Sequence, residues 1–192
     1  MQAGAAPPPF IVWFTGLSGA GKTTTIAGLA VKELNARGSR AFLLDGDVVR
    51  QGLSSDLGFT SADRSENLRR AAEVAALLAD AGMIVMAAFI TPLNVDRALI
   101  RSRLGSYPFI EAFVSTPLDI AEKRDSKGLY RRARRGEIPH FTGLDSPFEL
   151  PEAPELRLDT TSTPATALAA AVVEAVLSRL RSGGTAEASE RR

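Results

Sequence analysis

The chain has 192 residues, a formal net charge of +1 and no cysteine. This length suits one compact domain with its own hydrophobic core, and the lack of cysteine excludes disulfides, thiol nucleophiles and cysteine-ligated metal sites. The near-neutral charge gives no general reason to expect nucleic acid or a membrane as a partner. Because the sequence also has no secretory or membrane-spanning pattern, we expect a cytoplasmic protein.

The order of apolar and helical segments predicts an α/β domain. Short apolar runs that indicate strands occur at 10–14, 41–44, 83–89, 110–114 and 156–159. Between and after them, helices are expected at 21–36, 65–81, 117–125 and 164–181. This alternation is typical of a three-layer sandwich, a mainly parallel sheet with helices on both faces. We expect this domain to span 10–181, with flexible ends at 1–9 and 182–192.

The first apolar run leads into GLSGAGKTT at 16–24, which opens the first helix. Small residues let backbone N–H groups converge on phosphate oxygens, and the helix directs its positive end at them. Lys22 can reach the β- and γ-phosphates, and the Thr23 hydroxyl can complete a magnesium shell. This phosphate loop predicts binding of a nucleoside triphosphate. The residues expected to hold it are Gly16, Leu17, Ser18, Gly19, Ala20, Gly21, Lys22, Thr23 and Thr24.

The second apolar run ends in Asp45-Gly46-Asp47, which places two carboxylates at the carboxyl edge of the sheet, beside the phosphate loop. One carboxylate could orient or deprotonate an acceptor hydroxyl, and the other could hold magnesium directly or through water. The residues do not divide these roles, and a plain Asp-Gly turn is the alternative. Because no Asn-Lys-x-Asp run for guanine recognition occurs, we favour phosphoryl transfer to a small molecule over a GTPase switch.

The segment 50–70, RQGLSSDLGFTSADRSENLRR, predicts a site for an anionic ligand that carries a ring. Guanidinium groups bind phosphate or sulfate oxygens, an aromatic face stacks on a base, and an amide reads polar edges. The side chains that offer these groups are Arg50, Phe59, Arg64 and Asn67. Arg69 and Arg70 are expected on a solvated helix face.

The segment 123–143, KRDSKGLYRRARRGEIPHFTG, concentrates positive charge and suits a mobile lid over nucleotide phosphates. Closure would exclude water and favour transfer over hydrolysis. The competing interpretation is an RNA-binding patch in which Tyr130 and Phe141 stack on bases, although the near-neutral chain argues against it. His140, the only histidine, is expected to be a packing or surface residue of the lid rather than a catalyst.

In order and spacing, these motifs resemble the adenylylsulfate kinases. The similarity runs from residue 10 to residue 154. It includes GLSGAGKTT at 16–24, LDGD at 44–47, RQGL at 50–53, LGF at 57–59, DRSENLRR at 63–70, FITP at 89–92, KGLYRRARRGEI at 127–138 and FTGLDSPFE at 141–149. The resemblance implies a P-loop kinase fold, ATP and Mg²⁺ as cofactors, and a homodimer without nucleic-acid or membrane partners.

The resemblance further implies transfer of the ATP γ-phosphoryl group to the 3′-hydroxyl of adenosine 5′-phosphosulfate (APS), giving 3′-phosphoadenosine 5′-phosphosulfate (PAPS) and ADP in sulfate activation. Lys22, Asp45 and Asp47 would be catalytic, with Asp45 the preferred base, and Thr23 and Asp47 would hold the metal. The residues implied to contact the acceptor are Asp45, Asp47, Arg50, Phe59, Arg64, Asn67, Ile90, Thr91, Lys127, Leu129 and Phe141. Phe59 and Phe141 would sandwich its adenine.

Two positions depart from the family pattern. Thr91 replaces a serine that is a phosphorylated intermediate in some members, and Val48 replaces an asparagine after the acidic turn. We expect direct in-line transfer, with Thr91 contacting the acceptor. Two alternatives remain open: a kinase for another nucleotide or small hydroxyl compound, and a nucleotide-dependent RNA-binding module.

Overall fold

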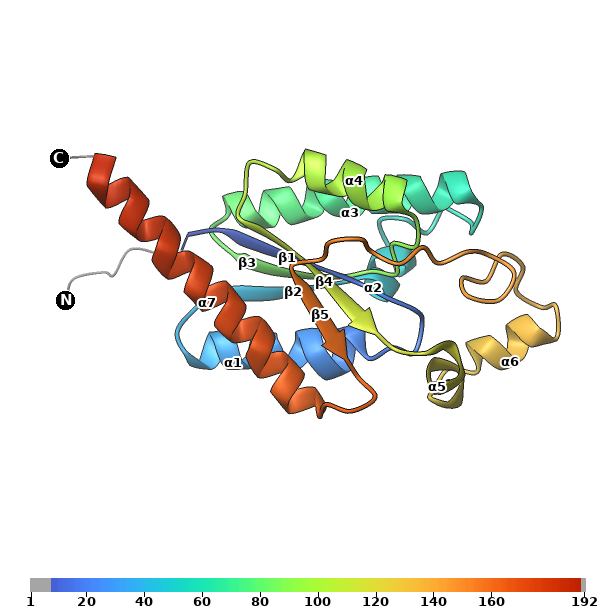
Figure 1. The fold of residues 1–192 in the computed structure, drawn as a ribbon. Helices are drawn as coiled ribbons and strands as arrows, with labels where there is room; N and C mark the ends of the chain where they lie inside the picture. The colour runs from blue at the N-terminus through green and yellow to red at the C-terminus, as the bar shows by residue number, and fades with distance from the viewer. Residues whose placement is uncertain (1–7, 191–192) are drawn as a thin grey trace.

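The computed structural model describes residues 8–190, with side chains described up to residue 182. Its middle layer is a five-stranded parallel sheet in the order β2-β3-β1-β4-β5 (Figure 1). The strands are β1 (Phe10–Thr15), β2 (Ala41–Asp45), β3 (Ile84–Ala88), β4 (Phe109–Ser115) and β5 (Leu156–Asp159). Each expected strand is present, and the predicted parallel α/β architecture is confirmed.

Helices cover both faces of the sheet. The helices of the chain are η1 (Lys22–Ala27), α1 (Gly28–Ala36), α2 (Gly46–Gln51), α3 (Ser61–Asp80), α4 (Asn94–Arg103), α5 (Leu118–Lys123), α6 (Leu129–Arg134) and α7 (Ala165–Glu190). In Figure 1, α1 and α7 cover one face of the sheet and α3 and α4 cover the other, and α5 and α6 lie beyond its end. Among the described residues, no helix combines the length and the apolar character needed to cross a membrane.

The central strand β1 shows why both faces are covered. Its side chains alternate, so Phe10, Val12 and Phe14 are buried in the cluster that includes α1 and α7. Ile11 and Trp13 are buried in the opposite cluster, with alanines of α3 and Ile100 of α4. A strand buried on both sides needs apolar residues at every position, which explains the unbroken apolar run.

Some helix bounds differ from expectation. The first expected helix is present, but its opening turn is a π-helix in which the Ile26 N–H donates to Gly21 O at 3.1 Å. The helix α3 begins at Ser61 rather than residue 65, because Thr60 and Asp63 form a capping box. The expected end of α7 at residue 181 is wrong, since the helix continues to Glu190. The glycines at 183–184 cost about 1 kcal/mol each in a helix and do not stop it.

The sequence did not predict α2, α4 or α6. The helix α2 begins where a plain Asp-Gly turn was the alternative, because the Asp45 carboxylate accepts from the Asp47 N–H at 2.9 Å and so caps a helix. The helix α6 lies inside the basic segment, where Asp125 accepts from the Leu129 N–H at 2.7 Å. Whether 182–190 is flexible stays a prediction, and residues 1–7 and 191–192 lie outside the described chain.

Candidate active site

The phosphate loop connects β1 to η1 at the carboxyl end of the sheet. Gly16 and Gly19 have positive φ values of 148° and 72°, and a Cβ at either would lie 2.7 Å from a backbone carbonyl oxygen. Only glycine therefore fits at these two positions. Among the described residues no side chain caps the start of η1 at Gly21, so the N–H groups of its first turn can meet a ligand phosphate.

Lys22 points into this loop. Its side chain is buried, and Nζ donates to Gly16 O and Leu17 O, both at 2.7 Å. Burial lowers the pKa of Lys22 to about 7, although the negative charges of Asp47 and Asp45 oppose that shift. The protein thus holds beside its phosphate loop an amine that has no ion-pair partner among the described residues, and a bound phosphate would supply one.

We expect ATP binding at about pH 8 to take up close to one proton. In the free protein the Lys22 pKa is about 7, so at this pH the amine is mostly neutral. Phosphate oxygens favour the charged form and raise that pKa, so the lysine gains a proton on binding and affinity falls as pH rises above 7. Calorimetry with an ATP analogue in buffers of different ionisation enthalpy measures the uptake, and heats that are independent of the buffer would contradict it.

The two carboxylates of the acidic turn have different surroundings. Asp45 ends β2, and its Oδ1 accepts from the Asp47 N–H at 2.9 Å. No hydrogen bond to its Oδ2 forms within the described residues, so that oxygen is available to an acceptor hydroxyl. Asp47 is paired instead with the Nζ of Lys127, from the basic segment.

Two arginines line the cavity that also contains the phosphate loop and the acidic turn. Neither has a carboxylate partner in the described part of the chain. Arg50 Nη1 donates to Gly58 O at 2.9 Å, and Arg64 Nε donates to Phe59 O at 3.0 Å. Burial lowers the pKa of both guanidinium groups, and the positive charge of Arg50 lowers the pKa of Arg64 further. Arg69 and Arg70, which were expected at the surface, differ from Arg50 and Arg64 in having a carboxylate partner, because both are paired with Glu66. The unpaired charges of Arg50 and Arg64 therefore mark a site for an anion.

Aromatic and amide groups complete the part of the cavity that Arg50 and Arg64 line. The Arg50 and Arg64 guanidiniums lie 4.5 and 5.7 Å from the centre of the half-exposed Phe59 ring. Arg64 Nη2 also donates to His140 O at 2.6 Å, so one guanidinium joins Phe59 to the residue before Phe141. Asn67 is buried, and its Oδ1 lacks a hydrogen-bond partner in the described structure. A ligand N–H would satisfy that oxygen.

The acceptor turn, which we define as Ile90–Thr91, holds a buried threonine side chain. Thr91 is 1% exposed and has a φ of 44°, which is unusual for a β-branched residue. Its hydroxyl accepts from the Trp13 indole N–H at 2.8 Å. Because the side chain is almost wholly buried, contact between Thr91 and an acceptor would run mainly through its backbone.

The basic segment 123–143 folds over the phosphate loop. Tyr130 is 1% exposed, lies edge-on to Phe141 with ring centres 4.8 Å apart, and donates its hydroxyl to Ser18 O at 2.9 Å. Arg132 and Arg134 form ion pairs with Glu137 and Glu122. Both aromatic rings that an RNA-binding patch would need are buried, which argues against that interpretation. His140 is an exposed residue of this segment, as expected. That the segment is mobile stays a prediction.

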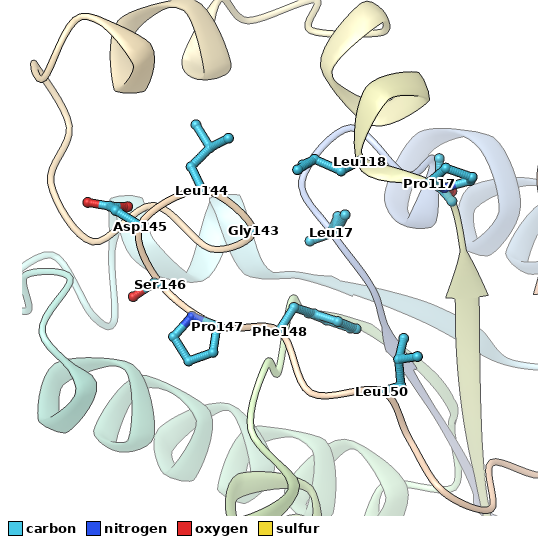
Figure 2. A pocket seen from close by; sticks show the side chains of 11 residues that line it. Leu17, Pro117, Leu118, Gly143, Leu144, Asp145, Ser146, Pro147, Phe148 and Leu150 are labelled. Carbon is cyan, nitrogen blue, oxygen red and sulfur yellow. The ribbon is translucent and has the colours of Figure 1, made fainter.

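One cavity of about 1120 Å³ brings most of the predicted residues together. Those that line it are Ser18, Gly19, Ala20, Gly21, Lys22, Thr23, Thr24, Asp45, Asp47, Arg50, Phe59, Arg64, Asn67, Ile90, Thr91, Lys127, Leu129 and Phe141. Gly16 and Leu17 do not line it. Leu17 faces a smaller cavity of about 590 Å³, where Figure 2 shows it near Leu118 and Phe148.

Sequence reasoning missed the far end of the larger cavity, which Arg124, Thr160, Thr163, Pro164 and Leu168 line. Arg124 donates to Thr160 Oγ1 at 3.0 Å and to Thr160 O at 2.9 Å. The available signal was the polar run after β5, because residues that follow parallel strands meet at the ligand-binding edge. The phosphate loop therefore lies between two ends of one cavity.

The family model for adenylylsulphate kinase matches residues 8–159. The chain belongs to the adenylylsulfate kinase family. An adenylyl-sulfate kinase of Marinobacter nauticus is 56% identical over 155 residues, covering 81% of this chain and 77% of that protein. The Mycobacterium tuberculosis APS kinase CysC, in complex with AMPPNP and APS, matches with a TM-score of 0.84 at 48% identity, covering 88% of this chain and 98% of that chain.

The bifunctional enzyme NodQ of Azospirillum brasilense is 55% identical over 166 residues, which are 86% of this chain but only 27% of NodQ. The expected family, its kinase chemistry and its use of ATP are confirmed by these adenylylsulfate kinase relatives. A sugar kinase from Janibacter, 20% identical with a TM-score of 0.57 and covering 86% of this chain and 93% of that chain, shares the fold alone.

Proposed function

We propose that this chain transfers the γ-phosphoryl group of ATP to the 3′-hydroxyl of APS, giving PAPS and ADP. The observation that carries the proposal is the shared cavity, in which a phosphate loop adjoins an aromatic pocket with two unpaired arginines. One nucleotide alone does not account for both ends of a cavity this large. An acceptor with an anionic group and a base matches the pocket of Arg50, Arg64 and Asn67.

We assign ATP to the phosphate loop, with its base toward Arg124 and Thr160, and the acceptor to the pocket at Phe59. The Asp45 carboxylate would then orient the acceptor hydroxyl and take its proton. Lys22, once charged, would stabilise the negative charge on the transferred phosphoryl group. Arg50 and Arg64 would hold the phosphosulfate, and Asn67 Oδ1 would accept from the acceptor base.

Magnesium fits the donor set at the phosphate loop. The Thr23 hydroxyl and the Asp47 carboxylate are hard oxygen donors on the same cavity. Within the described residues, no group of three or more His, Cys, Asp or Glu side chains could hold a metal alone, so the phosphates would complete the shell. When bound, magnesium neutralises charge on the β- and γ-phosphates. Lys127 would have to release Asp47 for the carboxylate to serve as a ligand.

The test is ADP release in the presence of magnesium with APS as acceptor, with AMP, a sugar and no acceptor as controls, and identification of the product by mass spectrometry. We expect PAPS to form only with APS. Equal turnover with AMP or a sugar would reassign the acceptor to another hydroxyl compound. Slow ADP release that APS does not stimulate, together with RNA affinity, would support a nucleotide-dependent RNA-binding module.

Replacing the exposed ring of the acceptor pocket should weaken APS binding. We expect Phe59→Ala to raise the KM for APS about tenfold and to leave the KM for ATP unchanged, because stacking on one base contributes roughly 1–3 kcal/mol. Initial rates at varied APS give this value. Phe42→Ala is a matched control, since Phe42 is 45% exposed, like Phe59 at 50%, but lies on β2 outside the cavity. If the KM for APS of Phe59→Ala is no higher than that of Phe42→Ala, Phe59 is not part of the acceptor site.

We also infer a cytoplasmic homodimer. Its support is the family resemblance and an exposed apolar pair on α4, where Val95 and Leu99 are 69% and 45% exposed and lie one turn apart. Sedimentation of the purified chain measures the state, and a monomer at micromolar concentration would contradict the inference.

A further inference from the structure

The acceptor turn is bonded to the base of the phosphate loop. Thr15 Oγ1, at the end of β1, donates to Ile90 O at 2.7 Å and to Thr91 O at 3.1 Å. The next residue, Gly16, donates its N–H to Ile90 O at 3.2 Å. With the indole bond to Thr91 Oγ1, these contacts hold a β-branched residue at positive φ. A strained conformation persists only where its surroundings fix it, and such residues cluster at functional sites.

Arg97 of α4 supports the same turn from behind the cavity. Its Nη1 donates to Thr91 O at 2.8 Å, and its Nη2 donates to Glu149 O at 2.7 Å and to Asn94 Oδ1. The guanidinium also lies 5.9 Å from the centre of the Phe148 ring. It therefore joins the acceptor turn to the segment 148–149, which follows Phe141 in the chain.

Two further bonds reinforce this junction. The Glu149 N–H donates to Pro92 O at 2.9 Å, and Glu149 Oε2 accepts from the Asn94 N–H at 2.6 Å. Figure 2 shows where this segment passes the phosphate loop, with Phe148 and Leu150 on the same cavity as Leu17. Arg97 is 6% exposed, and its only ion pair in the described residues is with Glu111 at 3.5 Å. Its hydrogen bonds are to backbone carbonyl oxygens of the two segments and to the side-chain amide oxygen of Asn94 in α4.

We propose that Arg97 is a positioning residue: it fixes the acceptor turn between the phosphate loop and the segment 148–149, and so sets the distance from the acceptor hydroxyl to the γ-phosphate. This inference rests on the proposed APS kinase activity. Arg97 does not line the cavity, so it acts through the backbone of Thr91. The planar guanidinium suits this role because it donates to both segments at once, which an ammonium group cannot do with the same geometry.

Arg97→Lys tests the proposal. The lysine keeps the charge opposite Glu111 but cannot reproduce the forked donation. We expect the kcat for PAPS formation to fall roughly 10- to 100-fold, because small displacements of a reacting group have effects of this size. The deciding readout is the ratio of ADP released to PAPS formed, which does not depend on the fraction of protein that is folded. We expect this ratio to rise several-fold, since a misplaced hydroxyl lets water compete for the phosphoryl group.

Arg101→Lys is the matched control. Arg101 lies one turn further along α4 and pairs with the same Glu111 at 3.1 Å, but it contacts neither the acceptor turn nor Glu149. It should keep both kcat and the ratio within twofold. Glu149→Ala is the second test variant, because Glu149 is exposed, and its loss removes both the bond from the Asn94 N–H and a negative charge that favours the Arg97 guanidinium. We expect about a threefold rise in its ratio.

An unchanged ratio in both Arg97→Lys and Glu149→Ala would overturn the proposal, whatever the loss of folded protein. So would an equal rise in Arg101→Lys. If Arg97→Lys does not fold, Glu149→Ala alone decides between these outcomes. Absence of PAPS from the wild-type chain is a different failure, because it would overturn the proposed acceptor together with the positioning role that rests on it.

Discussion

Asp45→Asn is expected to lower the kcat for PAPS formation by about 10²- to 10⁴-fold, the range for loss of a positioned general base. Asparagine keeps the shape of the side chain and can still accept from the Asp47 N–H, so the cap of α2 remains. ATP binding should change little, because the phosphate loop is intact. Single-turnover PAPS formation and ATP-analogue calorimetry measure the two effects separately.

The chain offers a close control for this substitution. Asp159 also ends a parallel strand, and its Oδ1 accepts from the N–H two residues on, Thr161, at 2.8 Å. It does not line the cavity, so Asp159→Asn should retain nearly full activity. Turnover by Asp45→Asn within tenfold of the wild-type rate would remove Asp45 from the role of base. The same loss in Asp47→Asn but not in Asp45→Asn would exchange their assignments.

The phosphate loop and the acidic turn could be predicted because their chemistry is local. Loop glycines, a lysine and a threonine at fixed spacing follow one strand, and the carboxylates follow another. Parallel strands bring their carboxyl ends to one edge, so the topology alone places the two motifs together. The structure adds what spacing does not contain, namely that Asp45 is a helix cap and that Asp47 pairs with Lys127.

The supporting contacts could not be predicted, because they join residues far apart in the chain. The bond from Trp13 to Thr91 spans 78 positions, and the bond from Arg97 to Glu149 spans 52. Nothing in the residues around Thr91 indicates that its hydroxyl is already bonded. The helix α4 was missed for a related reason: its buried positions include Asp96 and Arg97, which pattern reasoning assigns to a solvated face.

Replacement of Lys22 by Met should separate activity from stability. We expect kcat to fall by about 10²- to 10³-fold, the loss seen when one stabilising group for transition-state charge is removed. The free energy of unfolding should be unchanged or higher, because methionine fills a similar volume without the cost of burying an ammonium group. Thermal unfolding and PAPS formation give the two values. Lys32→Met, on the exposed side of α1, should change neither. A clear loss of stability in Lys22→Met would mean that its bonds to Gly16 O and Leu17 O hold the loop in shape, and retained activity would remove Lys22 from the catalytic assignment.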